Sequence, residues 1–305
     1  MIERAARSAL EEALGDEVAF DVPMSRHTSL RVGGPADVLA TPGDRGALAR
    51  LLRVCARHRL PHHLLGSGFN TLVLDGGLAG VAISLRRLRR LEERPGGLLR
   101  AEAGVSHSQV TRLCSARGLS GLEFAAGIPG TVGGWIAMNA GIPEREMVDV
   151  VREVEVVSPA GRRRTHVPAR GLRFGYRRLR GLAPGSVVVS ALLAIQLASP
   201  SAVRARVDDH LSRRQVTQPI NVPSCGSVFR NPPGDHAGRL IEAAGLKGCR
   251  AGGAQISTVH ANFIANTDGA TASDVLALID RARAEVLRQH GVRLDLEVQV
   301  VGRAA

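Results

Sequence analysis

Two glycine-rich stretches of this chain could bind a ligand through their backbone amides. Residues 127–141 read GIPGTVGGWIAMNAG, with five glycines in fifteen positions, and residues 66–71 read GSGFNT. Glycine allows positive φ angles and lets backbone amides approach a bound group closely. A run of unpaired N–H groups in a turn binds anions such as phosphate. Either stretch alone is compatible with an ordinary glycine-rich turn, but the pair predicts a ligand that carries a diphosphate.

The segments around the first stretch have the pattern of short strands and helices. Residues 2–14 place apolar side chains at helical spacing and are expected to form a peripheral helix. We expect a strand, a turn and a second strand from residue 26 to residue 42, and then a helix around Leu48 and Leu51. The GSG of residues 66–68 is not followed by a further glycine that opens a long helix, which excludes a Rossmann unit.

The middle of the chain positions the second stretch. A strand is expected at residues 98–103 and a helix at 106–117, with Gly118 as its C-cap. Residues 150–158 and 187–197 are expected to be buried strands. The three arginines at 162–164 are interpreted as the solvated edge of a hairpin. The Ser-Pro-Ser sequence at 199–201 is the expected domain boundary.

The last hundred residues have the pattern of a separate unit. Helices are expected at residues 202–214 and 273–290, and a strand at 292–300. Hydrophobic and polar residues alternate in this strand, so Glu297 points away from the face of Leu296 and Val298. Its carboxylate therefore enters either solvent or a cleft.

Composition limits the class of protein. The 305 residues are 44% hydrophobic and 22% charged, as in a soluble globular protein of two or three packed units, and they include no apolar run long enough for a membrane span. The formal charge is +12, but only 3% of residues are aromatic, which disfavours nucleic-acid binding and favours an anionic small-molecule substrate. The four cysteines show no metal-site or disulfide spacing. We expect no metal, a cytoplasmic location and a monomer.

Several stretches together resemble the UDP-N-acetylenolpyruvoylglucosamine reductase family of flavoenzymes. They occur in family order along nearly the whole chain. The matching stretches are LRVGGPA from Leu30, GSGFNTLVLDGG from Gly66, GIPGTVGGWIAMNAG from Gly127, FGYR from Phe174, CGSVFRNP from Cys225, AGRLIEAAGLKG from Ala237 and GVRLDLEVQVVG from Gly291. Each motif alone is weakly specific, whereas the ordered set is highly specific.

The resemblance implies an α+β fold with FAD as cofactor. It implies an N-terminal helix at 1–20, then a two-part FAD-binding domain of the vanillyl-alcohol-oxidase type at 21–198, with subdomains at about 21–85 and 86–198. A smaller substrate-binding domain follows at 199–305. The two glycine stretches correspond to the segments with which members of the family bind the FAD pyrophosphate. The implied cofactor contacts are Gly66, Ser67, Gly68, Phe69, Asn70, Thr71, Gly127, Ile128, Pro129, Gly130, Thr131, Gly133, Gly134, Ala140 and Gly141.

The resemblance also implies a reaction. NADPH would deliver a hydride through FAD to the enolpyruvyl double bond of a UDP-sugar. Ser227 would donate the proton, while Arg177 and Glu297 would stabilise the enolic intermediate through its carboxylate. A serine hydroxyl is a poor acid in water, so this role requires a dry and prearranged site. Without the resemblance, Ser227 would be a serine that caps a turn and Arg177 one more exposed arginine.

Substrate contacts are implied for Tyr176, Arg230 and Asn231, although Asn231 alone would be read as a turn residue before Pro232. The chain departs from the family at three places. Phe69 replaces a hydroxyl residue, Thr217 stands where some members have lysine, and the extra tyrosine-bearing loop is absent. Two alternatives stay open: another FAD-dependent oxidase or dehydrogenase, and a non-catalytic basic nucleotide- or RNA-binding protein.

Overall fold

The computed structural model describes residues 2–162 and 164–304. Its contacts divide the chain into two compact units that are each discontinuous in sequence. Unit 1 comprises Met1–Phe20, Val38–Gly66 and Gly80–Arg213, and unit 2 comprises Asp21–Asp37, Ser67–Ala79 and Arg214–Ala305. These units differ from the linear division expected from the sequence, because residues 21–37 and 67–79 pack with the C-terminal part.

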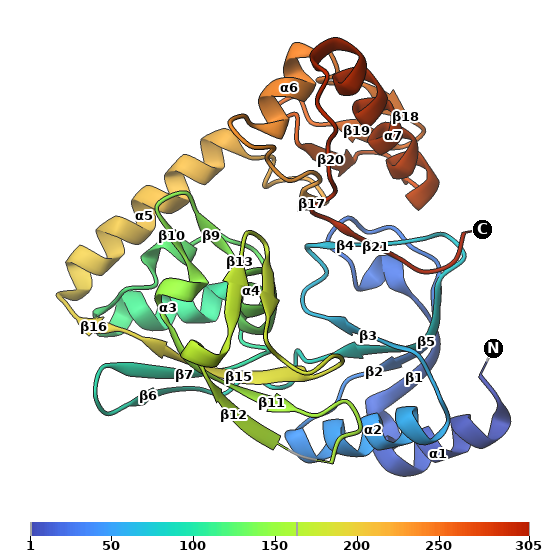
Figure 1. The fold of residues 1–305 in the computed structure, drawn as a ribbon, viewed down its shortest axis with the longest axis vertical. Coiled ribbons are helices and arrows are strands. Elements are labelled where there is room, and N and C mark those ends of the chain that lie inside the picture. Colours follow the sequence, from blue (N-terminus) through green and yellow to red (C-terminus); the bar gives the residue numbers. More distant parts are fainter. Residues whose placement is uncertain (1, 163, 305) are drawn as a thin grey trace. The chain divides into compact units, whose positions relative to one another are not determined.

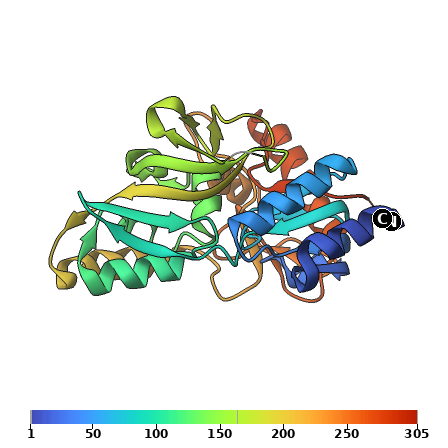
Figure 2. The same cartoon turned by 90° about the horizontal axis from the view of Figure 1, so that it is seen from below.

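Unit 1 contains the helix pair α1 (Arg4–Leu14) and α2 (Arg45–Arg57), which lie side by side in both ribbon views (Figures 1 and 2). The stripe of Ala6, Leu10 and Leu14 on α1 is buried in a cluster with α2, so this helix is part of a core. Asp44 caps α2 by accepting a hydrogen bond from the Ala47 amide (2.8 Å). Both helices confirm the 3.6-residue spacing seen in the sequence.

A four-stranded sheet has the order β1-β2-β5-β3, with β1 at Val18–Pro23, β2 at Pro35–Ala40, β5 at Leu78–Ser84 and β3 at His62–Leu65. The expectation of a strand directly after residue 26 is wrong, because residues 27–34 form a loop. Arg31 has a φ of 58°, which a strand does not allow, and Thr28 Oγ1 donates to the Val32 carbonyl (2.9 Å).

The central five-stranded antiparallel sheet of unit 1 has the order β12-β11-β15-β7-β6. Its strands are β6 (Leu91–Arg94), β7 (Leu98–Glu102), β11 (Val151–Val157), β12 (Arg164–Pro168) and β15 (Val187–Ala194). Helix α4 (Val132–Met138) packs on β15 and β7, and α3 (His107–Arg117) joins the same hydrophobic cluster. The arginine-rich hairpin edge is confirmed for Arg164 in the edge strand β12, whereas Arg163 lies outside the described residues.

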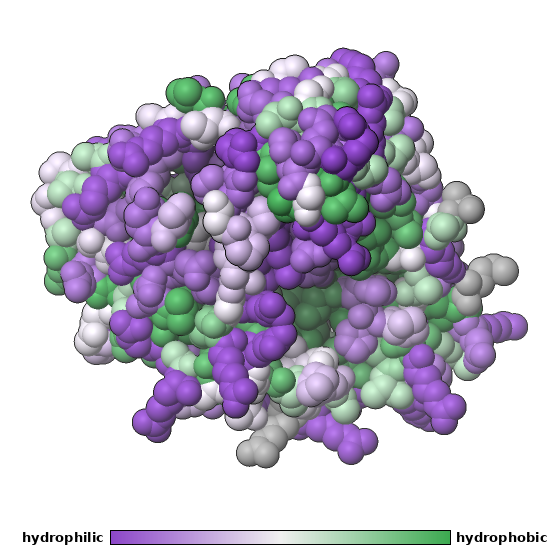
Figure 3. Space-filling model, turned by 45° about the horizontal axis from the view of Figure 1, so that its top comes forward, coloured by the Kyte–Doolittle hydropathy of each residue, from purple (hydrophilic) through white to green (hydrophobic). Residues whose placement is uncertain are grey.

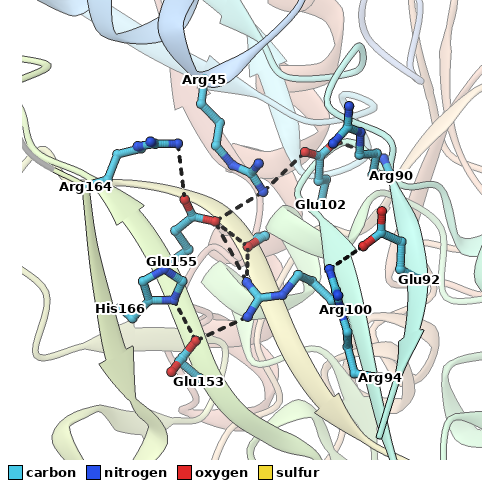
Figure 4. A network of polar contacts seen from close by, with 11 residues as sticks. Arg45, Arg90, Glu92, Arg94, Arg100, Glu102, Glu153, Glu155, Arg164 and His166 are labelled. Atoms are coloured by element: carbon cyan, nitrogen blue, oxygen red, sulfur yellow. Dashed lines mark hydrogen bonds and ion pairs between the residues drawn. The ribbon is translucent and has the colours of Figure 1, made fainter.

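The opposite face of this sheet carries charged side chains (Figure 4). Because side chains alternate along a strand, Glu155 and Glu102 point away from the face of Val154 and Ala101. Arg45 of α2 reaches both carboxylates, with Nη2 3.1 Å from Glu155 Oε2 and 3.2 Å from Glu102 Oε1. These ion pairs connect α2 to the central sheet.

Unit 2 is built on the antiparallel sheet β17-β20-β19-β18 and two helices. The strands are β17 (Ser224–Ser227), β18 (Arg250–Ala251), β19 (Ala254–Ile256) and β20 (Phe263–Asn266), and the helices are α6 (Ala237–Ala243) and α7 (Ala272–His290). Strand β21 (Gln299–Val301) pairs in parallel with β4 (Thr71–Val73). The expected strand over 292–300 is wrong for residues 292–298, where the described structure has one isolated bridge, between Leu296 and Phe229. The alternating burial is nevertheless present: Leu294 and Val298 are buried, while Arg293 and Asp295 are exposed.

Helix α5 spans Pro200–Thr217, and the remaining strands are short. They are β8 (Leu119–Ser120), β9 (Gly141–Ile142), β10 (Arg145–Glu146), β13 (Arg173–Gly175), β14 (Arg178–Arg180) and β16 (Gln196–Leu197). No helix in the described part of the chain has the length and apolar character needed to cross a bilayer. On the face drawn in Figure 3, hydrophilic side chains predominate and hydrophobic ones form smaller patches between them.

Candidate functional site

The first glycine loop, residues 66–71, follows β3 and leads into β4. Among the described residues, the backbone amides of Ser67, Gly68 and Phe69 donate no hydrogen bond. Gly68 has a φ of +71°, and an added Cβ would lie 2.5 Å from the His27 carbonyl oxygen. Glycine is therefore required at this position, and three neighbouring N–H groups remain available for an anion.

In the second glycine stretch, some residues are packed with their amides hydrogen-bonded, and others leave their amides unpaired. Gly133 lies against β7: its amide donates to the Ala103 carbonyl (2.9 Å), and an added Cβ would lie 2.9 Å from the Ala103 Cβ. The amide of Ile128 donates to Ala125 (3.0 Å). These two amides are therefore already paired within the protein, and the assignment of Ile128 and Gly133 as FAD contacts stays a prediction.

Three other amides in this stretch, those of Gly130, Thr131 and Gly134, donate no hydrogen bond to any described residue. An added Cβ on Gly130 would meet no atom within 4 Å, so the space beside it is open. An added Cβ on Gly66 would lie 3.0 Å from Thr131 Oγ1, so the start of the first loop meets the second stretch. The open space and the unpaired donors beside Gly130 fit an anionic group such as the diphosphate of FAD.

Ser227 ends strand β17 in unit 2, close to the first glycine loop. Ser29 Oγ lies 3.0 Å from the Gly68 carbonyl oxygen and 2.7 Å from the Ser224 carbonyl oxygen, and so links loop and strand. An added Cβ on Gly226, which has a φ of +73°, would lie 3.6 Å from the Phe69 carbonyl oxygen. The strand bulges between its pairings at Ser224 and Ser227. A bulge re-aims the side chain that follows it.

Glu297 is held beside Ser227 by backbone hydrogen bonds. Its amide donates to the Val228 carbonyl (2.8 Å), and two residues after Val228 the Arg230 amide donates to the Asp295 carbonyl (2.9 Å). Glu297 is half-buried. The structure thus brings two of the three predicted catalytic residues together in unit 2, while Arg177 belongs to unit 1.

The residues after Ser227 include two predicted substrate contacts. Arg230 has its Nε buried, and this donor has no hydrogen-bond partner among the described residues. A buried donor without a partner is costly, which favours a ligand acceptor there. Asn231 accepts a hydrogen bond from the Ala237 amide (3.1 Å) at the start of α6, so its side chain has a structural role.

Asn262 is a buried residue that the sequence analysis missed. Its side chain accepts from the Phe229 amide (2.9 Å) and donates to the Phe229 carbonyl (2.8 Å), while its own carbonyl accepts from the Val228 amide. These bonds fix the backbone directly after Ser227. The asparagine is distant in sequence and belongs to no recognised motif, so no local signal identifies it.

Arg177 lies in the turn between β13 and β14 with a φ of 55°. Its Nη1 is 3.4 Å from Glu146 Oε1, and its Nη2 is 3.5 Å from the Gly141 carbonyl oxygen. The guanidinium carbon lies 4.8 Å from the centre of the half-exposed Tyr176 ring. Asn139, the left-handed C-cap of α4, donates to Glu146 Oε2 (2.7 Å). Glu146 and Asn139 are therefore further residues at the site that the sequence analysis missed.

Comparisons with known proteins agree with this geometry. The family described as UDP-N-acetylenolpyruvoylglucosamine reductase, C-terminal domain, matches residues 218–301, and the FAD binding domain family matches residues 36–166. The reductase of Geotalea uraniireducens is 41% identical, with 97% of this chain and 98% of that protein covered. The chain belongs to the UDP-N-acetylenolpyruvoylglucosamine reductase family. The family resemblance and the flavin-binding fold expected from the motifs are thus confirmed.

Two further proteins that are similar to this chain support the assignment to the UDP-N-acetylenolpyruvoylglucosamine reductase family. The reductase of Alkalilimnicola ehrlichii is 49% identical, with 92% of this chain and 94% of that protein covered. The crystal structure of the Thermus caldophilus enzyme is 36% identical and superposes with a TM-score of 0.79, with 93% of this chain and 98% of that chain covered. Since the similarity extends over both units, it includes the glycine loops and the Ser227 strand.

Proposed function

We propose that this protein reduces the enolpyruvyl group of a UDP-linked N-acetylglucosamine in peptidoglycan precursor synthesis, with FAD as cofactor and NADPH as hydride donor. The observation that carries the proposal is the 41% identity to a curated reductase over 97% of the chain. FAD, when bound, supplies the group that accepts and delivers the hydride. The unpaired amides of the two glycine stretches would hold its diphosphate.

Ser227 is assigned as the proton donor. Addition of a hydride to the enol ether leaves negative charge at the carbon beside the carboxylate, and this carbon then takes a proton. A neutral hydroxyl can provide it only where the resulting alkoxide is stabilised by preorganised donors. The backbone around Ser227, fixed by the bonds from Asn262 and the amide of Glu297, supports such preorganisation.

Arg177 and Glu297 are assigned to the substrate carboxylate, where charge builds up during the reaction. Arginine presents a planar pair of N–H donors that matches a carboxylate. Glu146 holds the guanidinium in place before substrate binds. Glu297 would have to be protonated to donate to that carboxylate, and its half-buried position beside Ser227 is compatible with this role. The buried Nε of Arg230 provides a further donor for the anionic substrate.

Anaerobic stopped-flow measurement of the two half-reactions tests the assignment of Ser227. We expect Ser227→Ala to leave flavin reduction by NADPH nearly intact and to slow reoxidation by the enolpyruvyl sugar about 100-fold or more, since a positioned acid contributes about 10² to 10⁴ in rate. Ser224→Ala, in the same strand, serves as the control. Equal slowing of both half-reactions would refute the role of Ser227.

A simpler measurement separates the two alternative functions. A purified protein without flavin absorbance, even after reconstitution with FAD, would remove both flavoenzyme functions and leave the nucleotide-binding alternative. Flavin absorbance without reoxidation by the enolpyruvyl sugar would point to another flavin oxidase or dehydrogenase. The cytoplasmic location and the monomeric state stay predictions.

A further inference from the structure

Strands β13 and β14 form a two-stranded hairpin with three arginines on one face. Arg173 lies directly opposite Arg180, and Arg178 lies opposite Gly175. Phe174 and Leu179, which form the pair between them, pack against the hydrophobic cluster of unit 1. Because side chains alternate along a strand, the three arginines lie on the face away from that cluster, and all three are exposed.

These arginines line a cavity of about 580 Å³. The rest of its lining is Phe174, Tyr176 and three glycines. Among the described residues, no carboxylate lines this cavity. Tyr176, which is 44% exposed, also lines it. Positive charge and an aromatic surface thus occur in one cavity of a size suited to part of a nucleotide.

The charge arrangement is unfavourable without a ligand. Like charges directly opposite each other destabilise an antiparallel pair, although salt weakens the effect at an exposed site. Arg45 and Arg100 on the central sheet are paired with glutamates, whereas Arg173, Arg178 and Arg180 have no acidic partner among the described residues. A phosphate bound between Arg173 and Arg180 would replace repulsion by two charge-assisted contacts, which arginine makes in bidentate form.

We propose that the β13–β14 hairpin binds phosphate groups of a nucleotide through Arg173, Arg178 and Arg180. The choice of a nucleotide rests on the proposed function, which supplies two candidates with this chemistry: the dinucleotide reductant and the UDP-sugar. Arg177, in the turn of the same hairpin, is held by Glu146 and is not part of this set. The hairpin therefore combines a carboxylate-binding arginine in its turn with phosphate-binding arginines on its strands.

Calorimetric titration of the FAD-loaded protein tests the proposal with two probes, 2′,5′-ADP for the reductant and UDP for the substrate. We expect the double variant Arg173→Gln/Arg180→Gln to bind one of the probes at least tenfold more weakly, with a shallower dependence of log Kd on log salt. The probe that is weakened identifies the source of the phosphate. The matched control is Arg112→Gln/Arg204→Gln, which removes two exposed arginines of unit 1 that have no partner among the described residues.

Binding of both probes to the double variant within twofold of the unaltered protein would overturn the proposal. The variant removes a like-charge pair, so its thermal midpoint should not fall below that of the control. Arg173→Lys/Arg180→Lys retains the charge but not the planar fork and should recover only part of the affinity. Because these titrations measure no turnover, a protein that reduces the enolpyruvyl sugar but fails this test would contradict the hairpin proposal alone. A protein that takes up no FAD would contradict the proposed function instead.

Discussion

The guanidinium of Arg177 is anchored by the carboxylate of Glu146, with Nη1 3.4 Å from Oε1. The side chains are only 20% and 30% exposed, so solvent competes weakly for this pair. Asn139 holds the second carboxylate oxygen of Glu146, and the backbone of Gly141 accepts from the other end of the guanidinium. Arg177 is therefore oriented by the hairpin of β9 and β10, which follows the second glycine stretch.

We expect Glu146→Gln to lower the rate of flavin reoxidation by the enolpyruvyl sugar roughly tenfold, which corresponds to about 1.4 kcal/mol. The neutral amide keeps the shape of the side chain but loses the charge that orients Arg177. Flavin reduction by NADPH should be unchanged, and this separates a positioning effect from general damage. Glu144→Gln, an exposed neighbour, is the control. An unaltered reoxidation rate in Glu146→Gln would remove the positioning role.

Asn262→Ala should destabilise the protein by about 2 kcal/mol, because it leaves the amide and the carbonyl of Phe229 without partners in a buried place. Denaturant unfolding measures this. Asn221→Ala, at an exposed position, is the control. Full stability of Asn262→Ala would show that the two bonds contribute little.

Arg45→Met should cost about 3 kcal/mol of unfolding free energy, because it removes the shared cation from two nearly buried carboxylates. The side chains of Glu102 and Glu155 are only 9% and 7% exposed. Arg117→Met provides the contrast, since its pair with Glu93 is 64% and 36% exposed and should contribute at most about 1 kcal/mol. If both variants lose the same stability in denaturant unfolding, burial does not govern these ion pairs.

The buried thiols predict a loss of stability at alkaline pH. Burial, together with Glu123 and Glu93, raises the pKa of the Cys114 thiol to about 12, and burial raises that of Cys225 to about 12 and of Cys55 to about 11. An unfolded thiol ionises near 8.5. The folded thiols therefore contribute stability below that pH which is lost as the pH rises from about 8.5 to 12. This amounts to about 2 kcal/mol per thiol at pH 10.

Unfolding free energies of Cys114→Ala and Cys249→Ala at pH 7 and pH 10 measure this contribution. Cys249 is only partly buried, so its variant is the matched control. We expect Cys114→Ala to lose less stability than the control between the two pH values. The same decrease in both variants would contradict the role of the buried thiol. In the folded protein, a thiol reagent should modify Cys249 first.

Several elements could be predicted because their signals are local. The helix at 107–117 begins with the capping box of Ser106 and Gln109 and ends at the left-handed Gly118, and both signals lie within the helix sequence itself. The helix at 272–290 has the same kind of ends. Where pairing depends on distant residues, prediction was less successful: residues 27–34 form a loop, and the expected terminal strand pairs over only a few residues.

The ordered motifs by themselves determined the family, the flavin cofactor and the three residues proposed for catalysis. Each motif is a short run of neighbouring residues, so it can be recognised in the sequence without knowledge of tertiary contacts. Only the tertiary structure decided which amides remain unpaired. The amide of Gly133 donates to the Ala103 carbonyl, whereas the amide of Gly130 donates to no described residue. It also revealed that Glu146 orients Arg177 and that Asn262 fixes the backbone after Ser227. These contacts join residues far apart in the chain, and hydrogen bonds of that kind leave no periodic or local pattern in a single sequence.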